Sequence, residues 1–128
     1  MAAVELALVL PLFLVMVFGM VEFSLMLYDK AVITNASREA ARAGIVASSP
    51  KLTMGQIQTV ATNYCNTSLI SLGAAAIPTV TVTGAGGGYG TALSVTVSYV
   101  YSSTGVLSIF GLFNSTLNLT ATSVMNHE

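Results

Sequence analysis

The spacing of hydrophobic and polar residues divides the chain into three parts. Residues 1–21 are apolar throughout, apart from Glu5. A helix of this composition has no face suited to water and is therefore buried on every side where the protein works. From residue 22 the apolar residues recur on a helical period, and from residue 78 they alternate with threonine and serine. The pattern predicts one long helix followed by a small sheet.

The long helix is expected to run from Ala2 to about Ser48, because no cluster of turn residues interrupts it. About 47 residues at 1.5 Å each form a rod of roughly 70 Å, which is longer than one small domain needs. Residues 1–24 are predicted to be a projecting hydrophobic helix, close to the roughly 20 residues that cross a bilayer. Pro11 removes a backbone hydrogen bond, so a kink or a local opening is expected there.

Residues 25–128 are predicted to form a head built on the second half of this helix. Its apolar and small residues are expected to be the packing face: Phe23, Met26, Leu27, Val32, Ile33, Ala36, Ala40, Ala43 and Gly44. The charged residues are expected mainly on the other side: Asp29, Lys30, Arg38, Glu39 and Arg42. Small side chains on the packing face would let another element approach closely.

A second helix is predicted over residues 50–64, with Ser49 as the N-cap and Pro50 as the first helical residue. Alternation of apolar and polar residues predicts strands near 78–83, 92–101 and 117–125. The glycine-rich residues 84–90, GAGGGYG, are predicted to join the first two strands as a hairpin loop. The expected fold class is therefore α+β: a long helix that is half hydrophobic and projecting, a short second helix and a small antiparallel sheet.

The connection between the last two strands, residues 102–116, is unexpectedly apolar. Its candidate contact residues are Val106, Leu107, Ile109, Phe110, Leu112 and Phe113. A long hydrophobic loop either lies under the sheet or contacts the head of a neighbouring molecule. The pattern alone leaves both arrangements open.

Composition supports a protein that is covered by lipid or by other subunits. The chain of 128 residues is 54% hydrophobic and only 7% charged, against about 25% charged in ordinary soluble domains. Its net charge is −1 and its four basic residues form no patch, so nucleic acid is not an expected partner. The single cysteine, Cys65, excludes an intrachain disulfide and a zinc site and is interpreted as a small buried hydrophobe.

No arrangement of residues predicts catalysis, a cofactor or a metal. His127 is the only histidine, so a Ser-His-Asp triad has no basis. The pair His127 and Glu128 supplies too few ligands to close a metal site. The GAGGGYG loop lacks the Gly-Lys-Ser/Thr of a phosphate loop and does not open a helix. The protein is therefore expected not to be an enzyme.

The most informative residue is Glu5, because a carboxylate in an apolar segment is costly and usually paired. No Lys or Arg precedes Lys30, so the nearest positive charge is the amino group of Met1. That amine could be met in the same chain or in a neighbouring chain shifted along the helix axis. The second arrangement would fix the stagger between copies. Alternatively, Glu5 lies among lipid headgroups.

Arg38, Glu39 and Arg42 form a charged group at helical spacing. Their types and spacing indicate either a solvated face or a row of salt bridges between subunits.

The chain resembles the TadE-like proteins, pilin-like subunits of tight-adherence (type IVc) pili. The shared features are the AVE start, the LPL around Pro11, the VEF near Glu22 and the stretch TNASREAARAG from Thr34. VTVSY, the apolar connection and the final LNLTATSVMNHE are also similar to that family. The resemblance therefore covers the long helix and the last third of the chain.

The resemblance implies a precursor with a short basic leader that a prepilin peptidase removes. Cleavage places a glutamate at the fifth mature position, so Met1 fits the first mature residue. In type IV pilins this glutamate pairs with the N-terminal amine of a neighbour, a role that carries over to Met1 and Glu5 alone. N-methylation of the first residue is common in that wider family.

Taken together, these features predict a structural subunit of a bacterial type IV-like pilus. The chain is expected in the inner membrane before assembly and then, with the pilus assembly machinery, in an extracellular helical filament of identical copies that serves cell adhesion. Two alternatives stay open. One is a minor pilin that primes or tips a filament of another protein, since family members are usually described as minor subunits. The other is a membrane-tethered extracellular binding module that does not polymerise.

Overall fold

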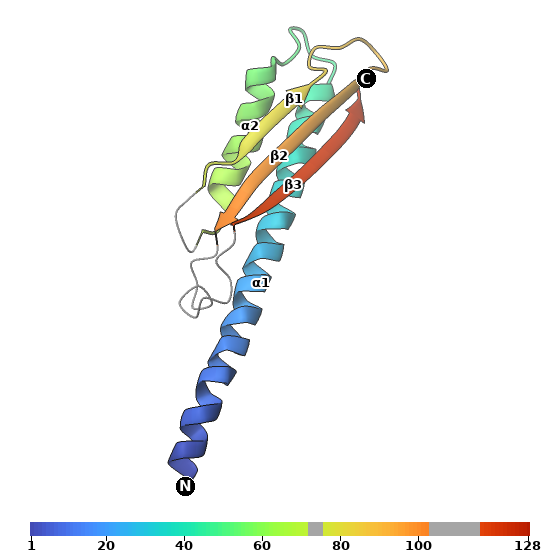
Figure 1. The fold of residues 1–128 in the computed structure, drawn as a ribbon. Coiled ribbons are helices and arrows are strands. Elements are labelled where there is room, and N and C mark those ends of the chain that lie inside the picture. Colours follow the sequence, from blue (N-terminus) through green and yellow to red (C-terminus); the bar gives the residue numbers. More distant parts are fainter. Residues whose placement is uncertain (72–75, 103–115) are drawn as a thin grey trace.

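The computed structural model describes residues 1–71, 76–102 and 116–128. These comprise helix α1 (Ala2–Ile45), helix α2 (Met54–Ser68) and strands β1 (Thr79–Thr83), β2 (Ala92–Ser102) and β3 (Thr116–Asn126). The N-terminal half of α1 projects from a head in which both helices lie against the sheet (Figure 1). The predicted α+β, pilin-like architecture is confirmed.

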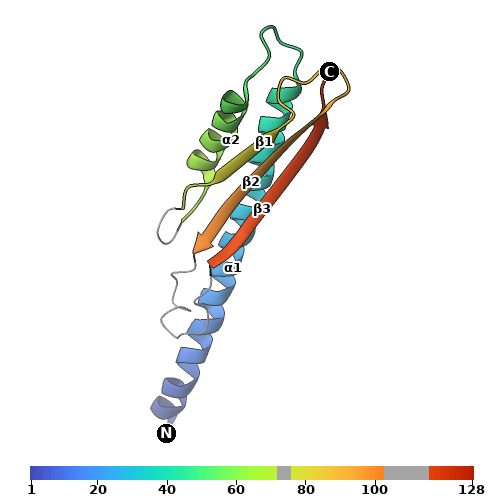
Figure 2. The same ribbon diagram turned by 45° about the horizontal axis from the view of Figure 1, so that its top comes forward.

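Helix α1 runs without interruption through Pro11 for 44 residues, which is about 66 Å at 1.5 Å per residue. It ends three residues before the predicted Ser48. Val46 has φ −59° and ψ 134°, an extended conformation that no helix can continue. The two views agree that the first half of α1 extends away from the helix and the strands of the head (Figure 2).

Helix α2 begins at Met54, and the predicted start at Pro50 is wrong. The N-cap is Thr53, whose hydroxyl accepts a hydrogen bond from the backbone N–H of Gln56. The Gln56 side chain in turn accepts from the backbone N–H of Thr53. This reciprocal capping box needs Gln or Glu three residues after the cap, and Ser49 is followed at that distance by Leu52. The helix also continues to Ser68, beyond the predicted end at Tyr64.

The sheet has the order β1-β2-β3, with both pairs antiparallel. This confirms the predicted hairpin across the glycine-rich loop. The face turned toward the helices carries the buried side chains of the strands: Val82, Leu93, Val95, Val97, Tyr99, Tyr101, Leu119 and Ala121. The opposite face carries rows of hydroxyls, as in the row Thr81, Thr96 and Thr122. The Thr96 and Thr122 hydroxyl oxygens lie 3.0 Å apart and share a hydrogen bond.

Small residues of α1 allow the close packing that the sequence predicts. Ala36, Ala40 and Ala41 are fully buried. At Gly44 a Cβ atom would lie 2.5 Å from Leu93 Cδ2 and 2.8 Å from Ile57 Cδ1. Helix α1, helix α2 and strand β2 therefore meet at this glycine, and no larger residue fits without movement of its neighbours.

Two residues expected on the packing face of α1 lie outside the core. Phe23 and Leu27 are exposed, whereas Met26 packs partly against the core. Among the described residues, Met26 is the first hydrophobic residue of α1 that packs against the core, so Phe23 lies before the part of the helix that the core covers.

Side chains of the helices cover one carbonyl on each outer edge of the sheet. Gln58 of α2 donates to the Val80 carbonyl of β1 at 3.1 Å. Lys30 of α1 donates to the Thr120 carbonyl of β3. Unpaired strand edges are templates for pairing with other chains, and polar side chains placed on them reduce that tendency.

The far end of the head is closed by the C-terminal residues. His127 is buried, its Nε2 lies 2.9 Å from the Gly84 carbonyl oxygen, and its backbone N–H donates to the Thr91 carbonyl. Its carbonyl accepts from the Gly90 N–H at 2.9 Å. The glycine-rich hairpin loop is therefore held at its base by the residue that the sequence showed only as an isolated histidine.

Candidate functional site

The projecting part of α1, residues 1–24, is here called the stem. Its large apolar side chains are exposed along its whole length, for example Leu8 at 75% and Leu12 at 70%. The most apolar 18-residue window of α1 has a mean hydropathy of 2.5 and none of it is buried. The helix is long and apolar enough to cross a membrane. So much exposed apolar surface marks a segment that is covered by lipid or by other molecules.

Met1 and Glu5 lie at the free end of the stem. The backbone N–H of Glu5 donates to the Met1 carbonyl at 3.3 Å, so the two residues are one helical turn apart. Across the described ranges, no salt bridge joins the Glu5 carboxylate to the Met1 amine in the same chain. Pro11, the third predicted assembly residue, lies within the exposed stem.

Asp29 lies where the stem enters the head, and its predicted place on the polar side of α1 is wrong. The residue is fully buried. Its Oδ1 accepts a hydrogen bond of 3.1 Å from the backbone N–H of Ile70, just after α2. Its Oδ2 has no hydrogen-bond partner among the residues that the structure describes. Burial raises the pKa of this carboxyl, and the Ile70 N–H opposes the shift only in part.

The sequence held a signal for this burial. Asp29 precedes Val32, Ile33 and Ala36 by three, four and seven residues, which places it on the same side of the helix as these buried residues. Its charge suggested a solvated position, but helical spacing and the packing of β2 over this side decide the outcome.

Two tyrosines of β2 share this junction. Tyr99 and Tyr101 are buried, and burial is the main cause that raises the pKa of both phenols. The negative charge of Glu22 further raises the pKa of Tyr101, and that of Asp29 contributes to both. The base of the head therefore holds one carboxyl, that of Asp29, and two phenols whose pKa values are all raised.

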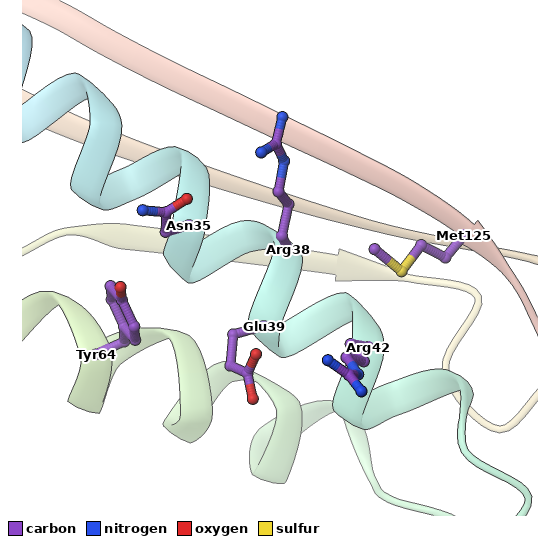
Figure 3. A pocket seen from close by; sticks show the side chains of 6 residues that line it. All are labelled: Asn35, Arg38, Glu39, Arg42, Tyr64 and Met125. Atoms are coloured by element: carbon purple, nitrogen blue, oxygen red, sulfur yellow. The ribbon is translucent and has the colours of Figure 1, made fainter.

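A shallow depression of about 410 Å³ lies on the outer side of α1. It is lined by Asn35, Arg38, Glu39, Arg42, Tyr64 and Met125, which are here called the arginine patch. The four α1 residues are flanked by Tyr64 from α2 on one side and by Met125 from β3 on the other (Figure 3). The α1 residues of the patch are exposed to solvent. The sequence showed the arginines, but the two flanking residues come from distant parts of the chain.

The six predicted head-to-head contact residues, Val106, Leu107, Ile109, Phe110, Leu112 and Phe113, lie outside the described residues. Cys65 is a free, fully buried cysteine, and burial raises the pKa of its thiol. Within the described ranges, no group of three or more His, Cys, Asp or Glu residues is arranged to hold a metal ion.

Comparison with known families identifies the long helix. The family model of TadE-like proteins matches residues 1–42. These residues are a TadE-like segment. The TadE-like segment includes the stem, Glu5, Asp29 and the α1 residues of the arginine patch up to Arg42. No match was found among curated proteins or among solved structures. The predicted resemblance is thus confirmed for residues 1–42, which include the projecting stem.

Proposed function

We propose that this chain is a structural subunit of a tight-adherence (type IVc) pilus filament. The observation that carries the proposal is the stem: a TadE-like helix with apolar side chains exposed on all sides, continuous with a folded head. Such a stem suits the inner membrane before assembly. It equally suits the core of a filament, where stems of neighbouring copies bury one another by hydrophobic packing.

The same helix suits both environments, because lipid and a bundle of apolar helices both require an apolar helix surface. The head begins near Met26, the first hydrophobic residue of α1 that packs against the core. In the proposed filament the heads form the outer wall. The outer face of the sheet, with its neutral hydroxyls, is suited to contact with water.

Glu5 has a specific part in the proposal. Its carboxylate pairs with the Met1 amine of an adjacent copy, because an acid in an apolar core needs a partner and the described residues of its own chain provide none. The pairing is satisfied at one axial stagger only, so it sets the register of the filament. The proposal includes prepilin peptidase as the processing enzyme and gives the chain no catalytic step, cofactor or nucleic-acid partner.

The test is the composition of fibres sheared from cells that produce the chain. A structural subunit is the main protein of the fibres, and its loss abolishes them. If the chain is present only in traces while another pilin forms the fibres, the priming or tip role holds instead. If cells carry the chain in the membrane fraction and form no fibres that contain it, the filament proposal is overturned and a membrane-tethered module remains.

A further inference from the structure

The four cations of the chain divide into two kinds. Lys30 and Lys51 each donate to a backbone carbonyl of the head, that of Thr120 and that of Gly87 respectively. Arg38 and Arg42 are exposed on α1 and have no ion-pair partner in the part of the chain that the structure describes. The two arginines are therefore the cations that remain for a contact outside the molecule.

Among the described residues, no acid of the same chain forms an ion pair with either arginine. The chain has five acidic residues: Glu5, Glu22, Asp29, Glu39 and Glu128. Residues 72–75 and 103–115, outside the described ranges, contain none of them. Asp29 is buried and bonded to Ile70, and Glu39 lies in the arginine patch without pairing with either arginine.

The patch has the composition of a protein interface. Arginine, tyrosine and methionine are enriched at interfaces, and Arg38, Arg42, Tyr64 and Met125 supply all three around one depression. Arg38 and Arg42 are four residues apart and so lie on the same side of α1. Two unpaired cations at this spacing destabilise the helix slightly, which a carboxylate from outside would reverse.

Charge along α1 is arranged so that a second copy can provide this carboxylate. The stem contains two acids, Glu5 and Glu22, and no Lys or Arg, whereas all four basic residues follow it. A copy shifted along the helix axis places its stem acids beside the patch. Glu22 precedes Arg38 by 16 residues and Arg42 by 20, so the required shift is about 24–30 Å.

We propose that the arginine patch binds the α1 helix of a second copy, with Arg38 and Arg42 pairing with the carboxylate of Glu22 at the upper end of its stem. This inference rests on the proposed filament, because parallel, staggered copies bring stem and patch together. Tyr64 and Met125 pack on the apolar stem on either side of the ion pairs. The aliphatic parts of the arginines can lie along the same stem while their guanidinium groups reach Glu22. Like the pairing of Glu5, this contact fixes the axial stagger between copies. It acts about 17 residues further along the chain, at Glu22.

The first test is cross-linking in assembled fibres. We expect the chain carrying E22C and R42C to form a ladder of dimers and higher multimers on mild oxidation. The single variants E22C and R42C remain monomers, and native Cys65 does not react because it is buried. The matched control pairs E22C with T122C on the outer face of the sheet and gives no ladder. Fibres that lack the E22C–R42C ladder, or that show it equally in the control, would overturn the proposal.

The second test measures the contribution of charge. The variant R38Q/R42Q keeps two polar side chains but removes two positive charges, and we expect the fibre yield to fall roughly tenfold or more. The control T81E/T122E shifts the net charge by the same amount on the outer sheet face and keeps the wild-type yield. If R38Q/R42Q gives the wild-type fibre yield, the proposed charge pairing is contradicted, even if the E22C–R42C variant forms cross-linked multimers. Failure of the filament itself is seen separately, as absence of the wild-type chain from sheared fibres.

Discussion

The backbone N–H of Ile70 donates a hydrogen bond of 3.1 Å to Oδ1 of the fully buried Asp29. This bond ties the second residue after α2 to the point where α1 leaves the head. The other carboxylate oxygen has no partner among the described residues. At the junction between stem and head, one oxygen of the Asp29 carboxylate is therefore hydrogen-bonded and the other is not. Their net effect on the stability of the head can be measured.

Asp29→Asn and Asp29→Ala separate the two oxygens. Asn keeps an acceptor for the Ile70 N–H and removes the buried charge, whereas Ala removes the acceptor as well. At pH 7 we expect the Asn variant to be at least as stable as the wild type and the Ala variant less stable than Asn by about 1 kcal/mol. The readout is labelling of Cys65, the single buried cysteine, in urea titrations of the full chain in detergent micelles. Equal stability of Asn and Ala would show that the Ile70 bond contributes nothing.

Stability should also depend on pH through Asp29. Burial raises the pKa of this carboxyl above its ordinary value of 3.8, so the folded head binds the proton more tightly than the unfolded chain. The stabilisation that comes from this tighter proton binding is therefore complete below the ordinary pKa. It is lost as the pH rises through the raised pKa of the folded state. Relative to Asp29→Asn, the wild type should lose stability between acidic and neutral pH. A constant difference between the two over that range would contradict this assignment.

Gly44→Val tests the close contact among α1, α2 and β2. A Cβ at this position already meets Leu93 and Ile57, so the larger side chain forces the three elements apart. We expect a loss of about 1–3 kcal/mol in the free energy of unfolding, measured by the same Cys65 labelling. Gly55→Val is the matched control in α2, where a Cβ meets nothing within 4 Å. Similar losses in both variants would show that helix propensity, and not packing, causes the effect.

Gly84→Ala tests the start of the hairpin loop. Gly84 has φ +83°, and a Cβ there would come closer than 3.0 Å to the Ala92 carbonyl oxygen. The expected cost is about 1–3 kcal/mol from backbone strain alone, with the clash added to it. Gly88→Ala is the control, because a Cβ at Gly88 meets nothing within 4 Å and its φ is not positive. Hydrogen exchange of the His127 amide, which donates to Thr91, would show whether the loop has opened.

Thr53→Ala removes the cap of α2 and should destabilise the head by about 0.5–2 kcal/mol. Ser49→Ala, at the residue that the sequence pattern suggested as the cap, should change stability little. Amide exchange in the first turn of α2 is the direct measurement, since that turn frays when the Thr53 hydroxyl no longer accepts from Gln56. The reverse order of the two effects would mean that the helix begins earlier than the structure shows.

Glu5→Ala tests the register role proposed for the stem. Because Glu5 is exposed far from the head, the variant should leave Cys65 labelling unchanged while fibre yield falls. Glu5→Asp is the conservative comparison, since it keeps the charge and shortens the reach to the Met1 amine. If Glu5→Ala assembles as many fibres as the wild type, the Glu5 carboxylate does not set the stagger between copies.

Much of the architecture follows from local pattern. The unbroken apolar run before Glu22 predicts a helix that is apolar on every side, and the alternation of Val with Thr and Ser repeats with the period of a strand. The capping box of Thr53 and Gln56 was equally present in the sequence, yet Ser49 and Pro50 offered a competing start. That boundary was missed because two local signals conflicted, and the reciprocal hydrogen bonds decided it.

The sequence alone determined the long helix, its exposed apolar stem, the helix–sheet order and the resemblance to TadE-like proteins, because each depends on spacing within one segment. Tertiary structure alone decided that His127 closes the hairpin loop and that Tyr64 and Met125 flank the two arginines. For Asp29, helical spacing gave a signal, but packing of the head decided its burial. These facts depend on which distant element packs against a residue. The sequence around a polar side chain does not show which distant element will exclude water from it. Asp29 becomes buried beside Ile70 only when α1 packs against the rest of the head.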